Sequence, residues 1–282
     1  MPSARSVYDG SWASLATRHD KGSLIAPVMG EILGLEVRDV DVDTDSLGTF
    51  TGEIERVGSM FEVAVAKARL GMTASGHSIG IASEGSIAPP PEVPWLVRDL
   101  ELVVLVDDSR NLAIGELVSS YDIVTVAEVV TPGDDLHELI RRADFPRHGL
   151  IVRPSTGPTD VVTKGIVTRS GLHDAIRRAA ESSADGRALV ESDLRAHMCP
   201  SRRPTITAAA HKLAERMARL CPSCDGPGWG TMRFEAGAEC RECGEETPVI
   251  RFEVAGCASC RHERRTEITP SVDASRCAWC NP

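Results

Sequence analysis

Hydrophobic and polar positions follow two different periods along the first 195 residues. Residues 35–42 alternate apolar with polar side chains, which is typical of a strand. Residues 23–33 and 53–72 repeat apolar side chains at helical spacing, and residues 78–83 and 101–107 are short apolar runs that predict buried strands. Alternation of such runs predicts an α/β fold, with a mixed, twisted sheet flanked by helices.

The remaining pattern predicts the domain boundaries. Residues 113–129 indicate one long strand or a hairpin, and a helix is expected near Asp134. Prolines 200 and 204 enclose a break, after which residues 205–220 carry an apolar stripe that predicts a docking helix. We therefore expect an α/β phosphate-binding domain over residues 1–198, a linker with its docking helix over 199–220, and a small β-rich zinc-ribbon domain over 221–282.

Composition and charge narrow the functional classes. The chain has 42% hydrophobic and 26% charged residues, the composition of a globular protein, and no run of about 18 apolar residues that could span a membrane. The formal charge of −10 argues against a protein that coats nucleic acid. From Met198 onward 12 Lys or Arg face 11 Asp or Glu, so the excess acid lies in the first part. Without a recognisable leader, we expect a cytoplasmic location.

Eight of the nine cysteines form four Cys-x-x-Cys pairs after residue 220. Two such turns complete a tetrahedral four-sulfur shell, so the sequence predicts two structural zinc ions. The eight ligands are Cys221, Cys224, Cys240, Cys243, Cys257, Cys260, Cys277 and Cys280. Cys199, the ninth cysteine, is expected to be an ordinary thiol near the domain junction.

Two pairings of these turns are considered. Neighbouring pairs could each form a ribbon, or the first pair could join the fourth and enclose the others. The glycines after Cys224 resemble the repeated knuckle of chaperone cysteine-rich domains, which use the nested pairing. Only the first turn keeps those glycines, so sequential ribbons are preferred.

The chain resembles a bacterial family of unknown function. The likeness is carried by residues 16–21, the loop 43–53, Lys67-Ala68, residues 82–86 and the cysteine-rich tail ending in Asn281-Pro282. This resemblance covers most of the chain and implies no activity.

A more distant resemblance is to the ITP/XTP pyrophosphatase fold. That family has an Ala-Thr-x-Asn-x-x-Lys loop, then a helix with Glu-Asn-Ala-x-x-Lys-Ala, then a strand ending in Ala-Asp-Asp-Ser-Gly. This chain offers Ala16-Thr17-Arg18-His19 with Lys21, then residues 62–68, then residues 82–86, in the same order. Val63 replaces the family's Asn, and Glu84 stands where the family has Asp.

The resemblance implies a set of functional residues. Glu62 and Glu84 would bind Mg²⁺, with Lys67 and Lys21 on phosphate oxygens. Other expected phosphate or metal contacts are Thr17, His19, Asp43, Asp45, Thr49 and Thr51. Each residue also has a structural explanation. Acids and lysines on a helix commonly form a solvated face, and residues 43–45 could simply stabilise a turn. Arg195, His197, Arg202 and Arg203 could close over an anionic substrate, although linker charges explain them better.

The leading hypothesis is therefore a magnesium-dependent phosphohydrolase or pyrophosphatase that acts on a nucleotide or related phosphate. Its zinc ribbons would recognise a nucleic-acid or protein partner or build a homo-oligomer. The alternative is a non-enzymatic adaptor with an inert nucleotide pocket whose ribbons bind nucleic acid or protein. Arg261, Arg264 and Arg265 form the local basic cluster that such binding would use.

Overall fold

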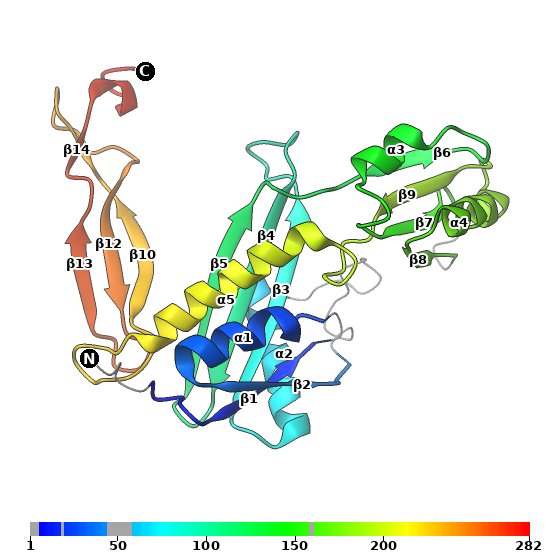
Figure 1. Cartoon of the computed structure of the whole chain (residues 1–282). Helices are drawn as coiled ribbons and strands as arrows, with labels where there is room; N and C mark the ends of the chain where they lie inside the picture. The colour runs from blue at the N-terminus through cyan, green and yellow to red at the C-terminus, as the bar shows by residue number, and fades with distance from the viewer. Residues whose placement is uncertain (1–5, 18–19, 44–57, 158–160) are drawn as a thin grey trace.

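The computed structural model describes residues 6–17, 20–43, 58–157 and 161–282. It contains a central five-stranded sheet with three covering helices, an inserted domain with its own sheet, and a cysteine-rich arm (Figure 1). The inserted domain and the arm lie at opposite ends of the long helix α5 (Arg203–Ala218). The mixed α/β class predicted from the sequence is confirmed.

The central sheet combines parallel and antiparallel pairing in the order β2-β1-β3-β4-β5. Its strands are β1 (Trp12–Ala16), β2 (Glu36–Val40), β3 (Ile79–Ala88), β4 (Arg98–Asp107) and β5 (Leu112–Ser120). β1 runs parallel to both β2 and β3, whereas β3, β4 and β5 are antiparallel neighbours. After β1 the chain adds β2 on one side of it and later adds β3 on the other side. β1 therefore marks the point where the strand order reverses.

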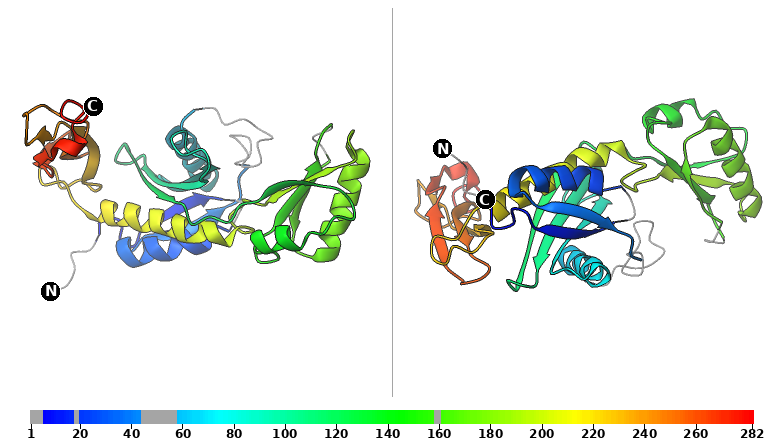
Figure 2. Two further views of the ribbon diagram at one scale, coloured as in Figure 1. Left: turned by 90° about the horizontal axis from the view of Figure 1, so that it is seen from above. Right: turned by 60° about the horizontal axis from the view of Figure 1, so that its bottom comes forward.

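Helices cover both faces of this sheet (Figure 2). α1 (Gly22–Leu33) and α5 pack on one face, around a core that includes Leu15, Ile81 and Leu105. α2 (Met60–Ser75) packs on the other face, where Ala64 and Ala68 meet Leu102 and Val104. Gly34 ends α1 in the left-handed conformation at φ 65, as the stop after Leu33 predicted.

α5 is the docking helix expected over residues 205–220. Its buried face consists of Thr205, Ile206, Ala209, Ala210, Leu213, Ala214 and Met217, at the spacing of one helical stripe. The stripe belongs to the same core as α1 and the central sheet. The helix thus completes the central domain and is more than a linker.

The predicted unit 1–198 contains two sheets with separate cores. The inserted domain has the antiparallel order β6-β9-β7-β8 and the core of α3, α4 and these strands. Its elements are β6 (Ala127–Val130), α3 (His137–Arg142), β7 (Leu150–Pro154), β8 (Thr163–Ile166), α4 (Arg169–Ser182) and β9 (Ala188–Ser192). The prediction of one strand or hairpin over residues 113–129 is wrong, because β5 and β6 belong to different sheets and do not pair. A short 3-10 helix, η2 (Pro200–Arg202), returns the chain to α5.

The arm is a three-stranded antiparallel sheet of β10 (Gly230–Ala236), β12 (Ile250–Gly256) and β13 (Glu263–Glu267). A second, small parallel pair joins β11 (Glu239–Cys240) to β14 (Ser271–Val272), and η3 (Ala274–Arg276) follows. Within the described ranges, no helix is both long enough and apolar enough to cross a bilayer.

We expect Leu213→Ala to lower the free energy of unfolding by about 2–5 kcal/mol, because Leu213 is fully buried between α5 and the central sheet. Glu215→Ala, two residues along on the exposed side of α5, is the matched control and should change it by less than about 0.5 kcal/mol. Urea denaturation measures both. Equal losses in the two variants would show that α5 is not held by its apolar stripe.

Candidate functional site

The arm brings the eight cysteines into two groups at opposite ends of its sheet. Each stretch between successive Cys-x-x-Cys pairs crosses the sheet once, because β10, β12 and β13 are antiparallel. The first and third pairs therefore lie at one end, and the second and fourth at the other. The groups are Cys221, Cys224, Cys257 and Cys260, and Cys240, Cys243, Cys277 and Cys280.

The sulfur positions fit zinc. A Zn–S bond of about 2.3 Å in a tetrahedron separates sulfurs by about 3.8 Å. The Sγ atoms of Cys221 and Cys260 are 3.7 Å apart, and those of Cys240 and Cys280 are 3.9 Å apart. Backbone amides also face the sulfurs, as in the hydrogen bond from the Ser223 N–H to Cys221 Sγ at 3.4 Å. Both groups are therefore suited to structural zinc.

The interleaved grouping corrects the predicted pairing. Neither sequential ribbons nor the nested alternative is present. Sequential ribbons would need a hairpin in each interval of 13 to 16 residues between successive pairs, which would return the chain to the same end. The structure uses each interval for one crossing strand with its turns, so successive pairs alternate between the ends. Four sulfurs at each group leave no open position for catalysis.

A second candidate site lies in the central domain, beyond the carboxyl end of β1. Leu15 pairs with Ile81 of β3, and β1 ends one residue later at Ala16, whereas β3 continues to Ala88. Ser83 and Glu84 therefore lie just past the end of β1. We call this position past the end of β1 the β1 crevice, as the name of a place in the sheet and not of a cavity. It is defined by Lys21, Ser83, Glu101 and Arg202 on the α1 face of the sheet and by Lys67 and Glu84 on the α2 face. Open α/β sheets place ligands at such a point of strand reversal.

Lys21 occupies the crevice from the start of α1. Its Nζ donates to the Ser83 carbonyl oxygen at 3.3 Å and to Ser83 Oγ at 3.1 Å. Burial lowers the pKa of Lys21 to about 8, against the opposing effect of the Glu101 carboxylate. The lysine is thus poised to lose or keep its charge near neutral pH.

Lys67 and Glu84 form an ion pair on the α2 face of the sheet. Glu84 pairs in register with Leu102, which belongs to the α2 core, and its side chain is 5% exposed. Lys67 extends from the middle of α2 to the Glu84 carboxylate, and its side chain is 12% exposed. The structure therefore brings together two of the three predicted catalytic residues.

Glu101 and Arg202 form a second pair on the opposite face. Arg202 Nε and Nη2 lie 2.7 and 2.6 Å from Glu101 Oε1, with both side chains at most 1% exposed. Burial raises the pKa of Glu101 to about 7, while Arg202 and Lys21 act in the opposite direction. Arg202 was interpreted as a linker charge and Glu101 was not singled out. The acids at 99 and 101 within an apolar strand were the available signal.

Glu62 is placed differently from its predicted role. Its Oε2 accepts hydrogen bonds of 2.8 Å from both the N–H and the Oγ of Ser59, in a capping box at the start of α2. The side chain is exposed, whereas Glu84 is buried. Ser59-x-x-Glu62 before an apolar run is the sequence signature of this cap. The residues therefore do not fit a magnesium site built from Glu62 and Glu84 together.

Of the other predicted contacts, two belong to the described residues. Thr17 follows β1 directly, and the exposed Asp43 follows β2 by three residues. His19, Asp45, Thr49 and Thr51 lie outside the described residues. Arg203 connects the crevice with α5, because its guanidinium lies 3.7 Å from Asp20 Oδ2 and 3.3 Å from Ser23 Oγ.

Arg195, His197 and Cys199 belong to the segment that leaves the inserted domain. Arg195 pairs with the buried Asp193, through Nε at 2.9 Å and Nη2 at 2.5 Å. Burial lowers the pKa of His197, and the neighbouring Arg195 acts in the same direction. Cys199 is buried, which raises the pKa of its thiol, as expected for an ordinary thiol near the junction.

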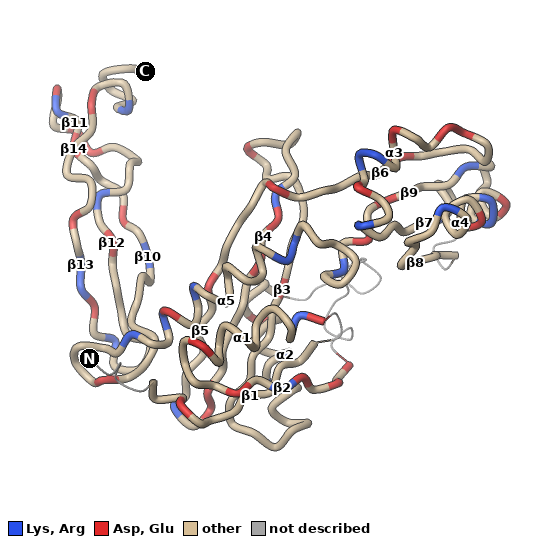
Figure 3. Tube along the Cα trace, viewed as in Figure 1, with Lys and Arg blue, Asp and Glu red and all other residues tan. Residues whose placement is uncertain are grey.

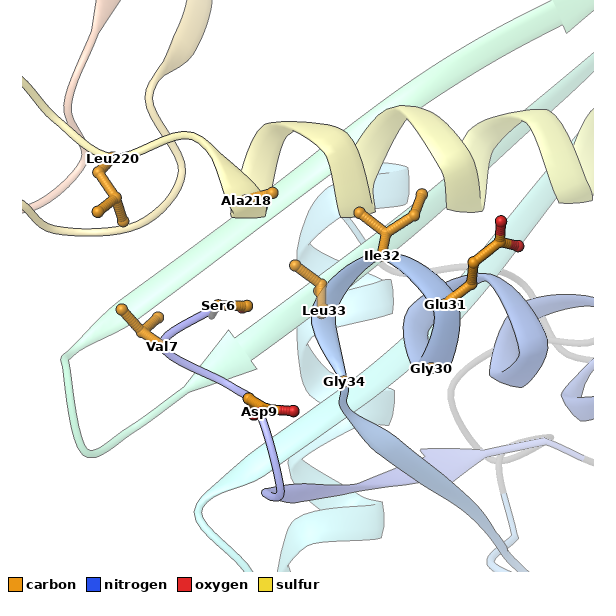
Figure 4. Close-up of a pocket in the computed structure, with 10 residues that line it drawn as sticks. All are labelled: Ser6, Val7, Asp9, Gly30, Glu31, Ile32, Leu33, Gly34, Ala218 and Leu220. Atoms are coloured by element: carbon orange, nitrogen blue, oxygen red, sulfur yellow. The ribbon is translucent and has the colours of Figure 1, made fainter. Parts of the chain in front are cut away.

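A separate cavity of about 590 Å³ lies at the other end of α1 (Figure 4). It is bordered by Val7 and Asp9 of the N-terminal segment, the last turn of α1, Ala218 at the end of α5 and Leu220 beyond it. The predicted site residues that belong to the described ranges do not line it. Lys21 begins α1 and this cavity surrounds its end, so the two sites are distinct.

Three arginines of the arm, Arg233, Arg251 and Arg265, form ion pairs with acids. Arg265 Nε contacts Glu235 at 2.8 Å, and Arg233 contacts Glu263 at 2.7 Å. Arg264 lies over the Trp229 ring at 5.8 Å. Figure 3 shows both signs interspersed along β10, β12 and β13. This cross-strand pairing weakens the predicted basic cluster as a phosphate-binding surface.

The zinc grouping predicts how paired substitutions remove metal. Cys224→Ser with Cys260→Ser alters one group, so about one zinc per chain should remain after dialysis against a chelator that spares four-sulfur sites. Cys224→Ser with Cys243→Ser alters both groups, so both ions should be lost. Native mass spectrometry counts the ions. Sequential ribbons would give the reverse result.

Comparison with protein families supplies one match, while comparison with curated proteins finds none. The matching model is described as a domain of unknown function, DUF6671, and it covers residues 67–282. The matched part includes Lys67, Glu84, Glu101, Arg202 and both cysteine groups, whereas Lys21 precedes it. The resemblance to a family of unknown function is thereby confirmed: the chain belongs to the DUF6671 family.

Proposed function

We propose that the protein is a phosphohydrolase that acts on a nucleotide or related phosphate in the β1 crevice. The observation that carries the proposal is the placement of Lys21 and of the Lys67–Glu84 ion pair on the two faces of β3, just past the end of β1, where the charges of Glu84 and Lys67 act on Lys21. These residues come from three separate segments and surround the point where open α/β sheets bind ligands. Two lysines and a buried carboxylate there suit an anion with a bound cation.

The two lysines would hold the phosphate oxygens. Lys21 enters beside the edge of β3, and Lys67 enters from α2. Their ammonium groups neutralise the charge that develops as a phosphoryl group is transferred, which is the main contribution a protein makes to this chemistry. Arg202, held by Glu101, adds a fixed positive charge behind them.

Mg²⁺ would arrive with the substrate's phosphates, with Glu84 as its carboxylate ligand. Mg²⁺ is commonly held by one or two carboxylates together with substrate phosphates. In the absence of both, Lys67 neutralises Glu84. A magnesium–phosphate complex offers a negative partner to Lys67 and a positive partner to Glu84, so binding exchanges one ion pair for two. This role for Glu84 does not require Glu62.

The nucleotide class rests on the resemblance to ITP/XTP pyrophosphatases. Residues 16–21, 62–68 and 82–86 occur in that family's order. In this chain Lys67 pairs with Glu84, the charges of both act on Lys21, and Glu62 caps α2. The part of the likeness that supports the proposal is therefore the phosphate-binding lysines and the acid at the end of the apolar strand.

The arm would recognise a protein partner or help build an oligomer. A groove of about 460 Å³ runs between the end of α5 and β10, where Met232 and Phe234 are 50% and 55% exposed. Half-exposed apolar side chains beside paired charges suit a protein surface better than a phosphate backbone. The adaptor alternative would use this arm without hydrolysis in the crevice.

We expect purified protein with Mg²⁺ to release phosphate or pyrophosphate from at least one member of a panel of nucleoside mono-, di- and triphosphates. Glu84→Gln should lower turnover by about 10²-fold or more, because it removes the metal-binding charge. Glu62→Gln, which can still form a capping box, should retain turnover. A fully active Glu84→Gln variant would refute the assignment. Loss of turnover in Glu62→Gln would restore the two-carboxylate magnesium site.

Phosphate binding should weaken as the pH rises through about 8, where Lys21 loses its proton. Above that pH the affinity for a non-hydrolysable triphosphate analogue should fall by up to about tenfold per unit, because only the charged lysine attracts it. The second phosphate ionisation near pH 6 is complete over this range. Isothermal titration from pH 7 to 9.5 measures the profile. Lys21→Arg keeps its charge and should flatten it, so an unchanged slope in that variant would exclude Lys21 as the titrating group.

A further inference from the structure

Ser201 fastens the inserted domain to the segment that enters α5. Its backbone N–H donates to His148 Nε2 at 3.2 Å, and its Oγ lies 3.0 Å from the same nitrogen. The N–H of Val124, on the strand-to-strand connection into the inserted domain, donates to Ser201 Oγ at 3.1 Å. Both connections between the central and inserted domains therefore meet at Ser201.

The hydrogen bonds fix the form of His148. A backbone N–H can only donate, so Nε2 must carry a lone pair and the ring proton must lie on Nδ1. Nδ1 is 3.0 Å from Asp144 Oδ2 and donates to it. The His148 side chain is only 3% exposed, and burial lowers its pKa, in opposition to Asp144. We call the contacts of Ser201 with His148 and Val124 the joint. The joint thus requires neutral imidazole.

The next residue along the chain reaches the β1 crevice. Arg202 pairs with Glu101 on β4 and also donates to the carbonyl oxygen of Leu194. Consecutive side chains at positions 201 and 202 therefore connect the inserted domain to the crevice. Displacement of Ser201 would move the backbone that carries the Arg202 guanidinium.

We infer that His148 is a positioning residue for the β1 crevice: its neutral imidazole holds Ser201, and thereby Arg202 against Glu101, and its protonation releases this joint. Only the consequence for phosphate binding rests on the proposed function. The joint itself is a property of the described contacts and can be tested without any substrate.

Protonation would place two donors face to face. An Nε2–H would point at the Ser201 N–H, with the ring cation buried away from water. The charged groups that act on His148 are Asp144, which favours its cation, and Arg147, which opposes it; Cys199 lies beyond Ser201. The pKa of His148 is lower in the folded protein than its ordinary value of 6.5. The stabilisation of the joint by neutral His148 is therefore complete above pH 6.5 and is lost as the pH falls below that value.

The order Asp144, His148, Ser201 also occurs in serine nucleophile triads, but the contacts favour a joint. Ser201 Oγ accepts the Val124 N–H, and the Ser201 N–H is directed to the imidazole. In a nucleophilic serine the hydroxyl faces a substrate, and backbone N–H groups nearby stabilise the oxyanion. These groups are already used here to hold three segments together.

Cys199 supplies a native probe of the joint. It is 1% exposed, its Sγ lies 3.5 Å from Ser201 Oγ, and it is the one cysteine in the sequence outside the four Cys-x-x-Cys pairs. We would follow its reaction with 2,2′-dithiodipyridine between pH 7.5 and 5.5. The rate of a Cys199→Ser variant is subtracted, and the difference is divided by the rate of N-acetylcysteine at the same pH.

The normalised rate should rise below pH 6.5 by up to about tenfold per pH unit in the full-length protein. His148→Gln, whose amide does not titrate, should remove this pH dependence. Asp144→Asn should extend the rise to lower pH, because it removes the carboxylate that favours the imidazolium in the folded state. Persistence of the wild-type profile in both variants, or no rise in the wild type, would overturn the inference.

Affinity for the triphosphate analogue should fall more steeply over the same acidic range in the wild type than in His148→Gln, because protonation of the phosphate near pH 6 lowers the affinity in both proteins. If no nucleotide binds at any pH, the proposed function fails while the Cys199 profile still decides the joint. If nucleotide binds but its affinity has the same pH profile in the wild type and in His148→Gln, the positioning role of His148 is refuted. The two failures are thus distinguishable.

Discussion

The buried pair of Arg202 and Glu101 is the interaction on which the arrangement of the central and inserted domains depends. Loss of one partner from such a pair costs about 3–5 kcal/mol, because the other charge remains buried. Room for the guanidinium exists only because β3 has glycine at position 85, where a Cβ atom would lie 2.1 Å from Arg202 Nη2. Through this pair the segment leaving the inserted domain is fixed on β4, and α5 starts in the correct place.

The arm has a sheet with only a small hydrophobic core, so its stability needs another source. Every residue of β13 is exposed, and the apolar cluster of the arm consists of Trp229 and two cysteines with a packed alanine. Zinc at both ends can supply the stability that burial does not. Because each ion joins pairs separated by two crossing strands and by one pair of the other group, each four-sulfur group depends on the sheet between them. The interleaving makes the arm one cooperative unit.

Features that depend on the local spacing of apolar residues were predicted from the sequence. Features that depend on contacts between distant segments were missed. The stop of α1 at Gly34 and the stripe of α5 are local, and both were predicted correctly. The pairing of the cysteines depends on how many strands separate them, and spacing alone did not distinguish one strand from a hairpin. Glu62 was assigned to metal because the resemblance outweighed its capping signature. Arg202 could not be assigned to the crevice without knowing that β4 lies against its helix.

The crevice is assembled from segments that no short motif could unite. Lys21, Lys67 and Arg202 supply three positive charges, and Glu84 and Glu101 supply two negative ones. Lys67 with Glu84 and Arg202 with Glu101 neutralise each other, and Lys21, held on Ser83, lies outside these two pairs with the buried Asp99 as the further acid near it. An entering anion therefore meets one cation directly and can recruit Lys67 only if Glu84 gains another positive partner. This dependence is the physical reason to expect that a divalent cation and a phosphate enter together.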